Sequence, residues 1–319
     1  MRLGINLGYW GAGMDGDNLA VAQEADRLGY DVCWAAEAYG SDAPTVLAWV
    51  AARTESIDVG SAIMQIPARQ PAMTAMTAAT LDSLSGGRFR LGLGVSGPQV
   101  SEGWYGVKFD KPLARTREYV EIVRRAMSRE RLSYEGEHWT LPLPDGPGKP
   151  IKLTVHPERE HIPLYIAAIG PRNLEQTGEI ADGALLIFPS ADHLEDTAVK
   201  YLRAGREKAG KTMEGFDVCP TLPLAVGDDV PGLADMFRPY TALYVGGWAA
   251  ASRTSTTSSP GAWATRRKPP RSRTSTSRAT RAAPPPPYRT SSSTRPPCSA
   301  RWSASPSGCR RTRPRASPR

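Results

Sequence analysis

The first candidate for chemistry is an acidic side chain at the end of an apolar stretch. Residues 30–36 have the composition of a buried strand, and Glu37 follows directly at its carboxyl end. Beside a bound ring, a carboxylate in this position could donate a proton or orient a group that does. A buried carboxylate is as often the partner of an Arg or Lys, so both roles stay open.

A second candidate is the beginning of a helix that could bind a phosphate. Gly170, Pro171, Arg172 and Asn173 follow an apolar segment, and proline is favoured in the first turn of a helix. The N–H groups of that turn have no partner within the helix and lie at the positive end of its dipole. An ordinary, well-capped helix is the alternative.

A glycine-rich segment in the middle of the chain has a spacing known from nucleotide-binding folds. Gly92-Leu-Gly-Val-Ser-Gly97 matches G-x-G-x-x-G, in which a helix opens after the glycine turn. Here Pro98 follows at once, and the next helix is expected only at about Lys111. We therefore interpret the segment as the end of a barrel strand, where small residues let a flat ring lie close to the backbone.

These candidates are carried by a unit of strand followed by helix that recurs along residues 1–247. Strands are expected at residues 2–9, 30–36, 57–66, 89–95, 162–168, 183–188 and 216–226. Helices are expected at residues 17–28, 43–53, 71–84, 111–130, 171–181, 191–209 and 231–244, with a small hairpin at 134–141. The pattern predicts an α/β fold, a TIM-type (β/α)8 barrel that lacks its eighth unit.

The charge of the chain is divided between two parts. The whole chain carries a net charge of +8, but residues 248–319 contain 16 Lys and Arg and no Asp or Glu. Residues 1–247 therefore have a net charge of −8 and form the predicted barrel domain. The tail at 248–319 is rich in Arg, Ser, Thr and Pro and has too few apolar residues to form a core, so we expect it to be disordered.

Two interpretations of this tail compete. A basic arm could bind nucleic acid by neutralising phosphates. Alternatively, residues 248–319 are the product of a shifted reading frame in GC-rich DNA. If the frame moves by one base and the first base of each codon is chosen freely, residues 287–319 translate back to a string that contains acids and apolar residues at helical spacing. We favour the shifted frame, so nucleic acid is not an expected partner.

Several other classes of protein are disfavoured. Met1 leads into a strand-like segment without the regions of a signal peptide, and no apolar run is long enough to span a membrane. We therefore expect a cytoplasmic protein. Its oligomeric state stays open, and a homodimer is one of the alternatives. The four histidines lack metal-ligand spacing, so no metal is expected. Cys33 and Cys219 lie in apolar strands and are expected to be buried, reduced thiols.

Five short motifs occur along residues 1–247. They are GYW at residues 8–10, AEAYGSD at 36–42, LSGGRFRLGLGV at 84–95, PLARTREY at 112–119 and IGPRN at 169–173. Together, and in this order, they resemble the luciferase-like monooxygenase superfamily and, within it, the branch of F420-dependent oxidoreductases. The resemblance implies a TIM-type barrel with an inserted segment, which binds the deazaflavin coenzyme F420 or FMN.

The resemblance also implies roles for individual residues. Glu37 and Ala38 match positions that touch the deazaflavin, but other members often carry His where Ala38 stands. The acid–base mechanism of the sugar dehydrogenases is therefore in doubt. A non-proline cis peptide bond is implied at Ala62-Ile63, where a bulge would support the ring from behind. Further cofactor contacts are implied at Ser96, Gly97, Gly170, Pro171, Arg172 and Asn173.

The expected function is an oxidoreductase that exchanges hydride between F420 and an unidentified small organic substrate, with Glu37 as the catalytic candidate. An FMN-dependent monooxygenase that uses reduced flavin and oxygen is the first alternative. The second is a non-catalytic, truncated product with a nucleic-acid-binding tail. A missing eighth strand would leave the first and seventh strands with unpaired edges.

Overall fold

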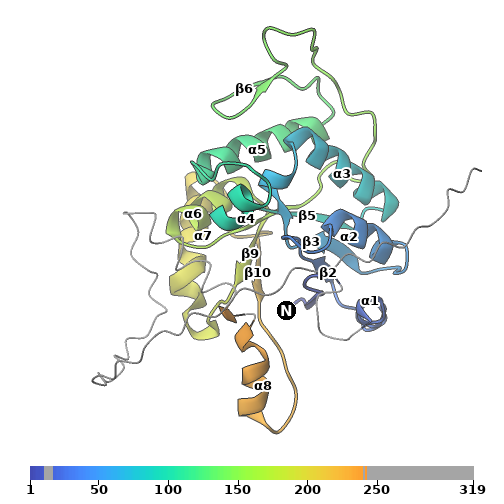
Figure 1. Cartoon of the computed structure of the whole chain (residues 1–319), viewed down its shortest axis with the longest axis vertical. Coiled ribbons are helices and arrows are strands. Elements are labelled where there is room, and N and C mark those ends of the chain that lie inside the picture. Colours follow the sequence, from blue (N-terminus) through green and yellow to red (C-terminus); the bar gives the residue numbers. More distant parts are fainter. Residues whose placement is uncertain (11–16, 240, 243–319) are drawn as a thin grey trace, which may run out of the picture. The chain divides into compact units, whose positions relative to one another are not determined.

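The computed structural model describes residues 1–10, 17–239 and 241–242 (Figure 1). The predicted tail at 248–319, and the last residues of the helix predicted at 231–244, lie outside this part. Seven parallel strands pair in chain order: β1 (Gly4–Asn6), β2 (Val32–Ala35), β3 (Asp58–Ser61), β5 (Phe89–Gly94), β8 (Leu164–Ala167), β9 (Gly183–Ile187) and β10 (Asp217–Thr221). The short β4 (Met64–Gln65) also pairs with β5. The predicted barrel of seven units is confirmed, and among the described residues the pairing ends at β1 and β10.

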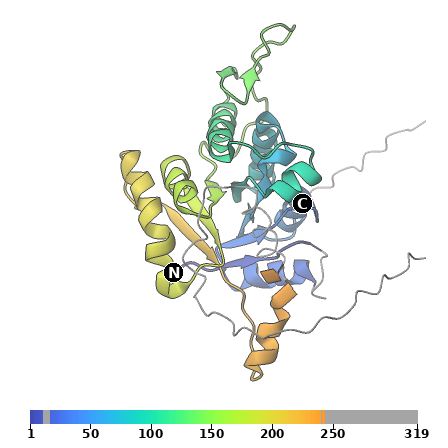
Figure 2. The same cartoon turned by 60° about the vertical axis from the view of Figure 1, so that its left-hand side comes forward.

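The helices lie outside the strands, and all of them except the last bury apolar side chains. They are α1 (Asn18–Arg27), α2 (Ala43–Ala51), α3 (Pro71–Leu84), α5 (Pro112–Met127), α6 (Pro171–Ile180), α7 (Lys200–Lys208) and α8 (Val230–Met236). Tyr119, Ile122 and Val123 of α5, for example, are fully buried. Figure 2 shows α6 and α7 side by side outside the strands. No helix in the described ranges is both long and apolar enough to cross a membrane.

The segment between β5 and β8 contains the predicted hairpin. Its strands, β6 (Tyr134–Glu135) and β7 (Thr140–Leu141), pair antiparallel. Three backbone N–H groups of the hairpin, at Glu137, His138 and Trp139, donate to the Glu118 carboxylate on α5. One acidic side chain of α5 therefore holds the turn of the hairpin in place.

Several predicted boundaries were wrong for local reasons. The strand predicted at 57–66 is divided into β3 and β4, and the strand predicted at 216–226 ends at Thr221, two residues before Pro223. A short helix, α4 (Pro98–Gly103), begins where a polar loop was expected, because Pro98 occupies its first turn. The G-x-G-x-x-G segment thus does precede a helix. The dinucleotide-binding fold is excluded instead by topology, because β1 lies at an edge of the sheet.

An ion-pair network crosses the barrel interior near the amino ends of the strands. Arg90 on β5 donates to the Asp58 carboxylate (2.7 Å) and to the Tyr165 hydroxyl (3.3 Å). That hydroxyl donates to Asp217 on β10 (2.7 Å), which also pairs with Arg2. Burial alone would lower the pKa of Arg90, but Tyr165 and Asp58 raise it above its ordinary value. The network therefore connects strands on both sides of the gap between β1 and β10.

We predict that Arg90→Met lowers the free energy of unfolding by about 3 kcal/mol, because the partly buried Asp58 loses its partner and Asp217 keeps only the exposed Arg2 as an ion-pair partner. Arg117→Met is the control, since the Arg117 side chain is more exposed than that of Arg90 and Glu179 keeps Lys208 as a partner, so its loss should cost less than about 1 kcal/mol. Urea unfolding measures both values. Equal losses of unfolding free energy in the two variants would contradict a larger contribution of the interior network to stability.

Candidate active site

The carboxylate of Glu37, directly after β2, is buried and accepts four hydrogen bonds. Two come from the Arg69 guanidinium (2.5 and 2.8 Å), one from the backbone N–H of Ala43 (3.2 Å) and one from that of Gln65 (3.0 Å). These donors belong to the segment before α3, the beginning of α2 and the strand β4. Glu37 therefore fixes three neighbouring segments relative to the end of β2.

The partner of Glu37 is itself held in a charged state. Arg69 also forms an ion pair with Asp42. Burial alone would lower the pKa of Arg69, but its hydrogen bonds to Glu37 and the charges of Glu37 and Asp42 raise it. The structural-partner role that the sequence left open for Glu37 is thus present in the structure. Proton donation by Glu37 stays a prediction, and its four hydrogen bonds leave little room for a further partner.

A bulge separates β3 from β4. The peptide bond Ala62-Ile63 is cis, as predicted. Ile63 points into the barrel: a Cβ atom added to Gly94 would lie 2.2 Å from its Cδ1 atom. A Cβ atom at Gly92 would lie 1.9 Å from the backbone oxygen of Ser61 and 2.8 Å from Leu185. The expectation that Gly92 and Gly94 make room for a ring was therefore wrong, because protein atoms occupy that space.

Gln65, immediately after the bulge, has one half of its side-chain amide bonded and the other half free. Its Nε2 atom donates to the backbone oxygen of Ala38 (2.7 Å) and to the Tyr105 hydroxyl (3.3 Å), which donates to the same backbone oxygen (3.0 Å). Its Oε1 atom is buried and has no hydrogen-bond partner among the described residues. The sequence did not predict these bonds of the Gln65 amide, because both of its partners come from distant segments.

Tyr105 follows α4 and contributes its hydroxyl to this group. Burial is the main cause that raises the pKa of Tyr105, and the negative charge of Glu37 is the second. The hydroxyl therefore stays protonated and can donate. Ser96 and Gly97 lie in the loop between β5 and α4, and Ser96 has a left-handed backbone (φ 61°). No observation tests the cofactor contact predicted for these two residues.

The residues Gly170, Pro171, Arg172 and Asn173 begin α6, directly after β8, as predicted. Pro171 occupies the first turn, and Gly170 has φ 84° and ψ 153°, a conformation that is essentially restricted to glycine. The Asn173 side chain donates weakly to the backbone oxygen of Ala167 (3.4 Å). The carboxyl ends of the parallel strands lie at one edge of the barrel, which we call the rim. The start of α6 therefore lies at the same rim as Glu37 and Ala62-Ile63.

These features fit a flavin-like cofactor with a phosphate. The rim offers a buried amide oxygen without a donor, at Gln65, and a helix start whose first N–H groups have no partner within the helix. Among the described residues, no group of His, Cys, Asp and Glu side chains could hold a metal ion.

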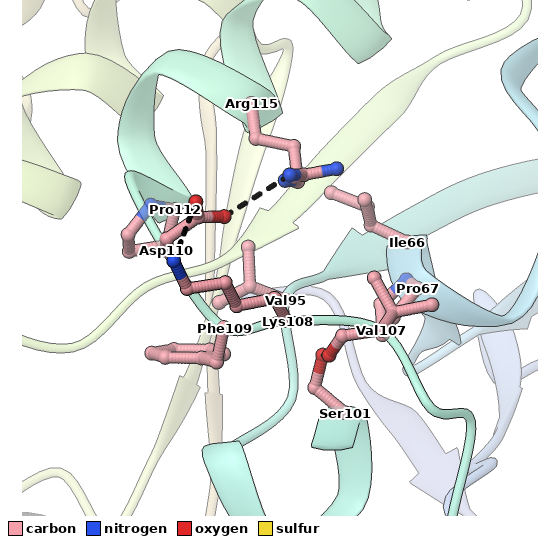
Figure 3. A pocket seen from close by; sticks show the side chains of 10 residues that line it. All are labelled: Ile66, Pro67, Val95, Ser101, Val107, Lys108, Phe109, Asp110, Pro112 and Arg115. Carbon is pink, nitrogen blue, oxygen red and sulfur yellow. Dashed lines mark hydrogen bonds and ion pairs between the residues drawn. The ribbon is translucent and has the colours of Figure 1, made fainter. Parts of the chain in front are cut away.

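A small pocket lies beside these residues, between Ile66-Pro67 and the connection from α4 to α5 (Figure 3). Its walls are mostly apolar, with Val95 and Phe109 among the lining residues. Arg115 donates to Asp110 (3.1 Å) at its edge. None of the predicted site residues lines this pocket, so we do not assign the active site to it.

We predict that Glu37→Gln and Arg69→Met each lower the free energy of unfolding by about 2–4 kcal/mol, because each leaves a buried partner unsatisfied. The double variant should lose about 1–3 kcal/mol less than the sum, which chemical denaturation of all four proteins measures. Arg203→Met, in an exposed pair with Glu195, should leave the free energy of unfolding nearly unchanged. Additive losses would contradict a direct coupling of Glu37 to Arg69.

Comparison with known proteins identifies relatives of the chain. The model of the luciferase-like monooxygenase family matches residues 13–287. A Mycobacterium tuberculosis protein, named as a candidate coenzyme F420-dependent oxidoreductase (Rv3520c), is 44% identical over 257 residues, which cover 78% of this chain and 74% of that protein. The 5,10-methylenetetrahydromethanopterin reductase of Archaeoglobus fulgidus is 31% identical over 226 residues, which cover 70% of this chain and 64% of the reductase, less than two thirds of its length.

A solved structure has a similar fold. The coenzyme F420-dependent tetrahydromethanopterin reductase from Methanopyrus kandleri superposes with a TM-score of 0.66 at 24% identity, covering 76% of this chain and 72% of the reductase. At that identity the likeness concerns the fold, and it confirms the predicted TIM-type barrel. The match of the family model, together with the 44%-identical relative, shows that the chain belongs to the luciferase-like monooxygenase family.

Proposed function

We propose that the protein exchanges hydride between coenzyme F420 and a small organic substrate. The observation that carries the proposal is the 44% identity, over 78% of the chain, to a protein named for F420-dependent oxidoreduction. The rim geometry supports it, because the Ala62-Ile63 bulge and the start of α6 lie at the same edge of the barrel. When bound, the deazaflavin supplies a ring carbon that accepts or releases hydride.

The residues of the rim would divide the binding of this cofactor between them. Ala62 and Ile63 would support one face of the ring. Ser96 and Gly97 would contact the ring from the loop after β5. Gly170, Pro171, Arg172 and Asn173 would bind the phosphate through the free N–H groups of α6, with the positive end of the helix dipole attracting its charge.

Glu37 would act by placing other groups. Its four hydrogen bonds to Arg69, Ala43 and Gln65 support a positioning role, in which the carboxylate holds β4 and its bulge against β2. Direct proton donation is the second hypothesis, and it would require one of these bonds to break. Ala38, beside Glu37, has no ionisable group to share such a step.

Other functions remain as alternatives. An FMN-dependent monooxygenase is supported by the name of the family to which the chain belongs. Reduction of a substrate like methylenetetrahydromethanopterin is supported by the name of a 31%-identical relative, a 5,10-methylenetetrahydromethanopterin reductase. Nucleic-acid binding would depend on residues 248–319, outside the described ranges, and would disappear on their deletion.

The proposed division into a barrel domain at 1–247 and a frame-shifted tail at 248–319 can be examined directly. Sequencing the DNA around the codons for Gly247 and Trp248 would show whether a base is missing or added. A frame-restored chain with acidic residues and apolar periodicity after residue 247 would support the proposal. An unbroken frame that encodes the same basic tail would refute it.

We predict that the protein quenches the fluorescence of F420 on binding and binds it at least about tenfold more tightly than FMN. Gly170→Ala should weaken F420 binding, because φ 84° at the start of α6 is unfavourable for alanine by about 1–3 kcal/mol. Gly210→Ala, at another positive φ (68°) after α7, is the control and should leave binding unchanged. Tighter binding of FMN would favour the monooxygenase, and binding of neither ring would refute a cofactor site.

A further inference from the structure

The walls of the small pocket in Figure 3 come from two parts of the chain. Ile66 and Pro67 come directly after β4, and Val95 comes directly after β5, one residue before Ser96. The other wall is the connection from α4 to α5, at residues 107–110. The pocket therefore lies next to the strand that carries the bulge and to the loop for which cofactor contacts are proposed.

The wall formed by residues 107–110 is held by hydrogen bonds to both neighbouring helices. The backbone N–H of Val107 donates to the backbone oxygen of Ser101 in α4 (2.8 Å), and the Ser101 hydroxyl donates to the backbone oxygen of Val107 (2.7 Å). At the other end of this wall, Arg115 of α5 donates to the Asp110 carboxylate (3.1 Å). Closing the pocket would require some of these bonds to break, so its space belongs to the folded structure.

The pocket is lined mainly by apolar side chains, and the charges at its edge balance. The apolar lining residues are Ile66, Pro67, Val95, Val107, Phe109 and Pro112. At the edge, Lys108 and Arg115 both form ion pairs with Asp110 (3.9 and 3.1 Å). The carboxylate of Glu102 accepts a hydrogen bond from the backbone N–H of Phe109 (3.0 Å). Two cations therefore face two carboxylates, which leaves no net charge to attract a phosphate or carboxylate group.

The size of the pocket and its lining favour an apolar occupant. Its volume of about 20 Å³ gives room for about one group of the size of a methyl group or a water molecule. Voids of this size are few in closely packed proteins, and apolar ones stay free of water. The Nε atom of Arg115 has no hydrogen-bond partner among the described residues, but it is buried and therefore offers no polar contact to a ligand.

We propose that this pocket receives a short alkyl group of the organic substrate while the carbon that exchanges hydride faces the cofactor ring. The inference rests on the proposed function and adds to it a substrate class, uncharged molecules that end in a short alkyl group. Val95 and Val107 are the specificity-determining residues, because they stand in the two walls of the pocket. Each methylene group that enters the pocket strengthens binding about fourfold, which corresponds to about 0.8 kcal/mol.

Xenon binding to the full chain tests whether the pocket accepts an apolar group. In methyl NMR spectra of the wild-type protein, xenon should shift the signals of Ile66, Val95 and Val107. Val107→Ile places one more methylene group in the pocket and should raise the Kd of xenon at least about fourfold. Val21→Ile is the matched control, because it adds the same group on the exposed surface of α1 and should leave this Kd unchanged. Signals of Ile66 and Val95 that do not move with xenon would overturn the inference.

Alkanols test whether the pocket is connected to the site of the ring. Ethanol, 1-propanol and 1-butanol should change the fluorescence of F420 bound to the full chain, and their Kd should fall about fourfold per methylene group until the pocket is filled. Val107→Ile should weaken the binding of 1-butanol more than that of ethanol, and Val21→Ile should weaken neither. Unchanged F420 fluorescence, or equal affinities in Val107→Ile and the wild type, would overturn the inference. Wild-type protein that takes up xenon but binds neither F420 nor FMN would instead refute the proposed function.

Discussion

The rim of the barrel depends on the buried carboxylate of Glu37. A buried charge is tolerated only when other groups compensate it, and here one guanidinium and two backbone N–H groups do so. Those groups come from α2, β4 and the segment before α3, so satisfying the charge requires all three to converge on the end of β2. The bulge at Ala62-Ile63 and the amide of Gln65 take their positions from this convergence.

The interior of the barrel explains why a ligand site can form only at the rim. Below the rim, large side chains lie against glycines of neighbouring strands: Trp34 against Gly60, and Ile63 against Gly94. A Cβ atom at either glycine would clash with these side chains. Trp34 also packs edge-on against Tyr165, with ring centroids 5.3 Å apart. Together with the Arg90 network, these side chains fill the space between the strands. The glycines near the end of β5 thus serve packing inside the protein, whereas Gly170 serves a backbone turn.

Local sequence signals predicted the elements well and the contacts between them poorly. The helix at Pro71–Leu84 was predicted to the residue, because a proline opens it and Gly86 and Gly87 follow it in left-handed conformations. By contrast, nothing near Glu37 indicates that Arg69, 32 residues away, is its partner. The free oxygen of Gln65 depends on Ala38 and Tyr105, which lie 27 and 40 residues away. Periodicity reports which face of an element is buried, but the pairing of polar atoms is decided only when distant segments meet.

The gap in the barrel has different consequences for stability and for the site. The candidate residues follow β2, β3, β5 and β8, each of which has paired neighbours on both sides. Among the residues that the structure describes, β1 and β10 are the edges of the sheet, and there Asp217 joins Arg2 to the interior network at the amino ends of the strands, the end opposite the rim. A chain without an eighth strand would therefore have fewer hydrogen bonds to hold the two ends of the sheet together. It leaves the hydrogen bonds that position Glu37, the bulge and Gln65 intact, since these lie among strands that are paired on both sides.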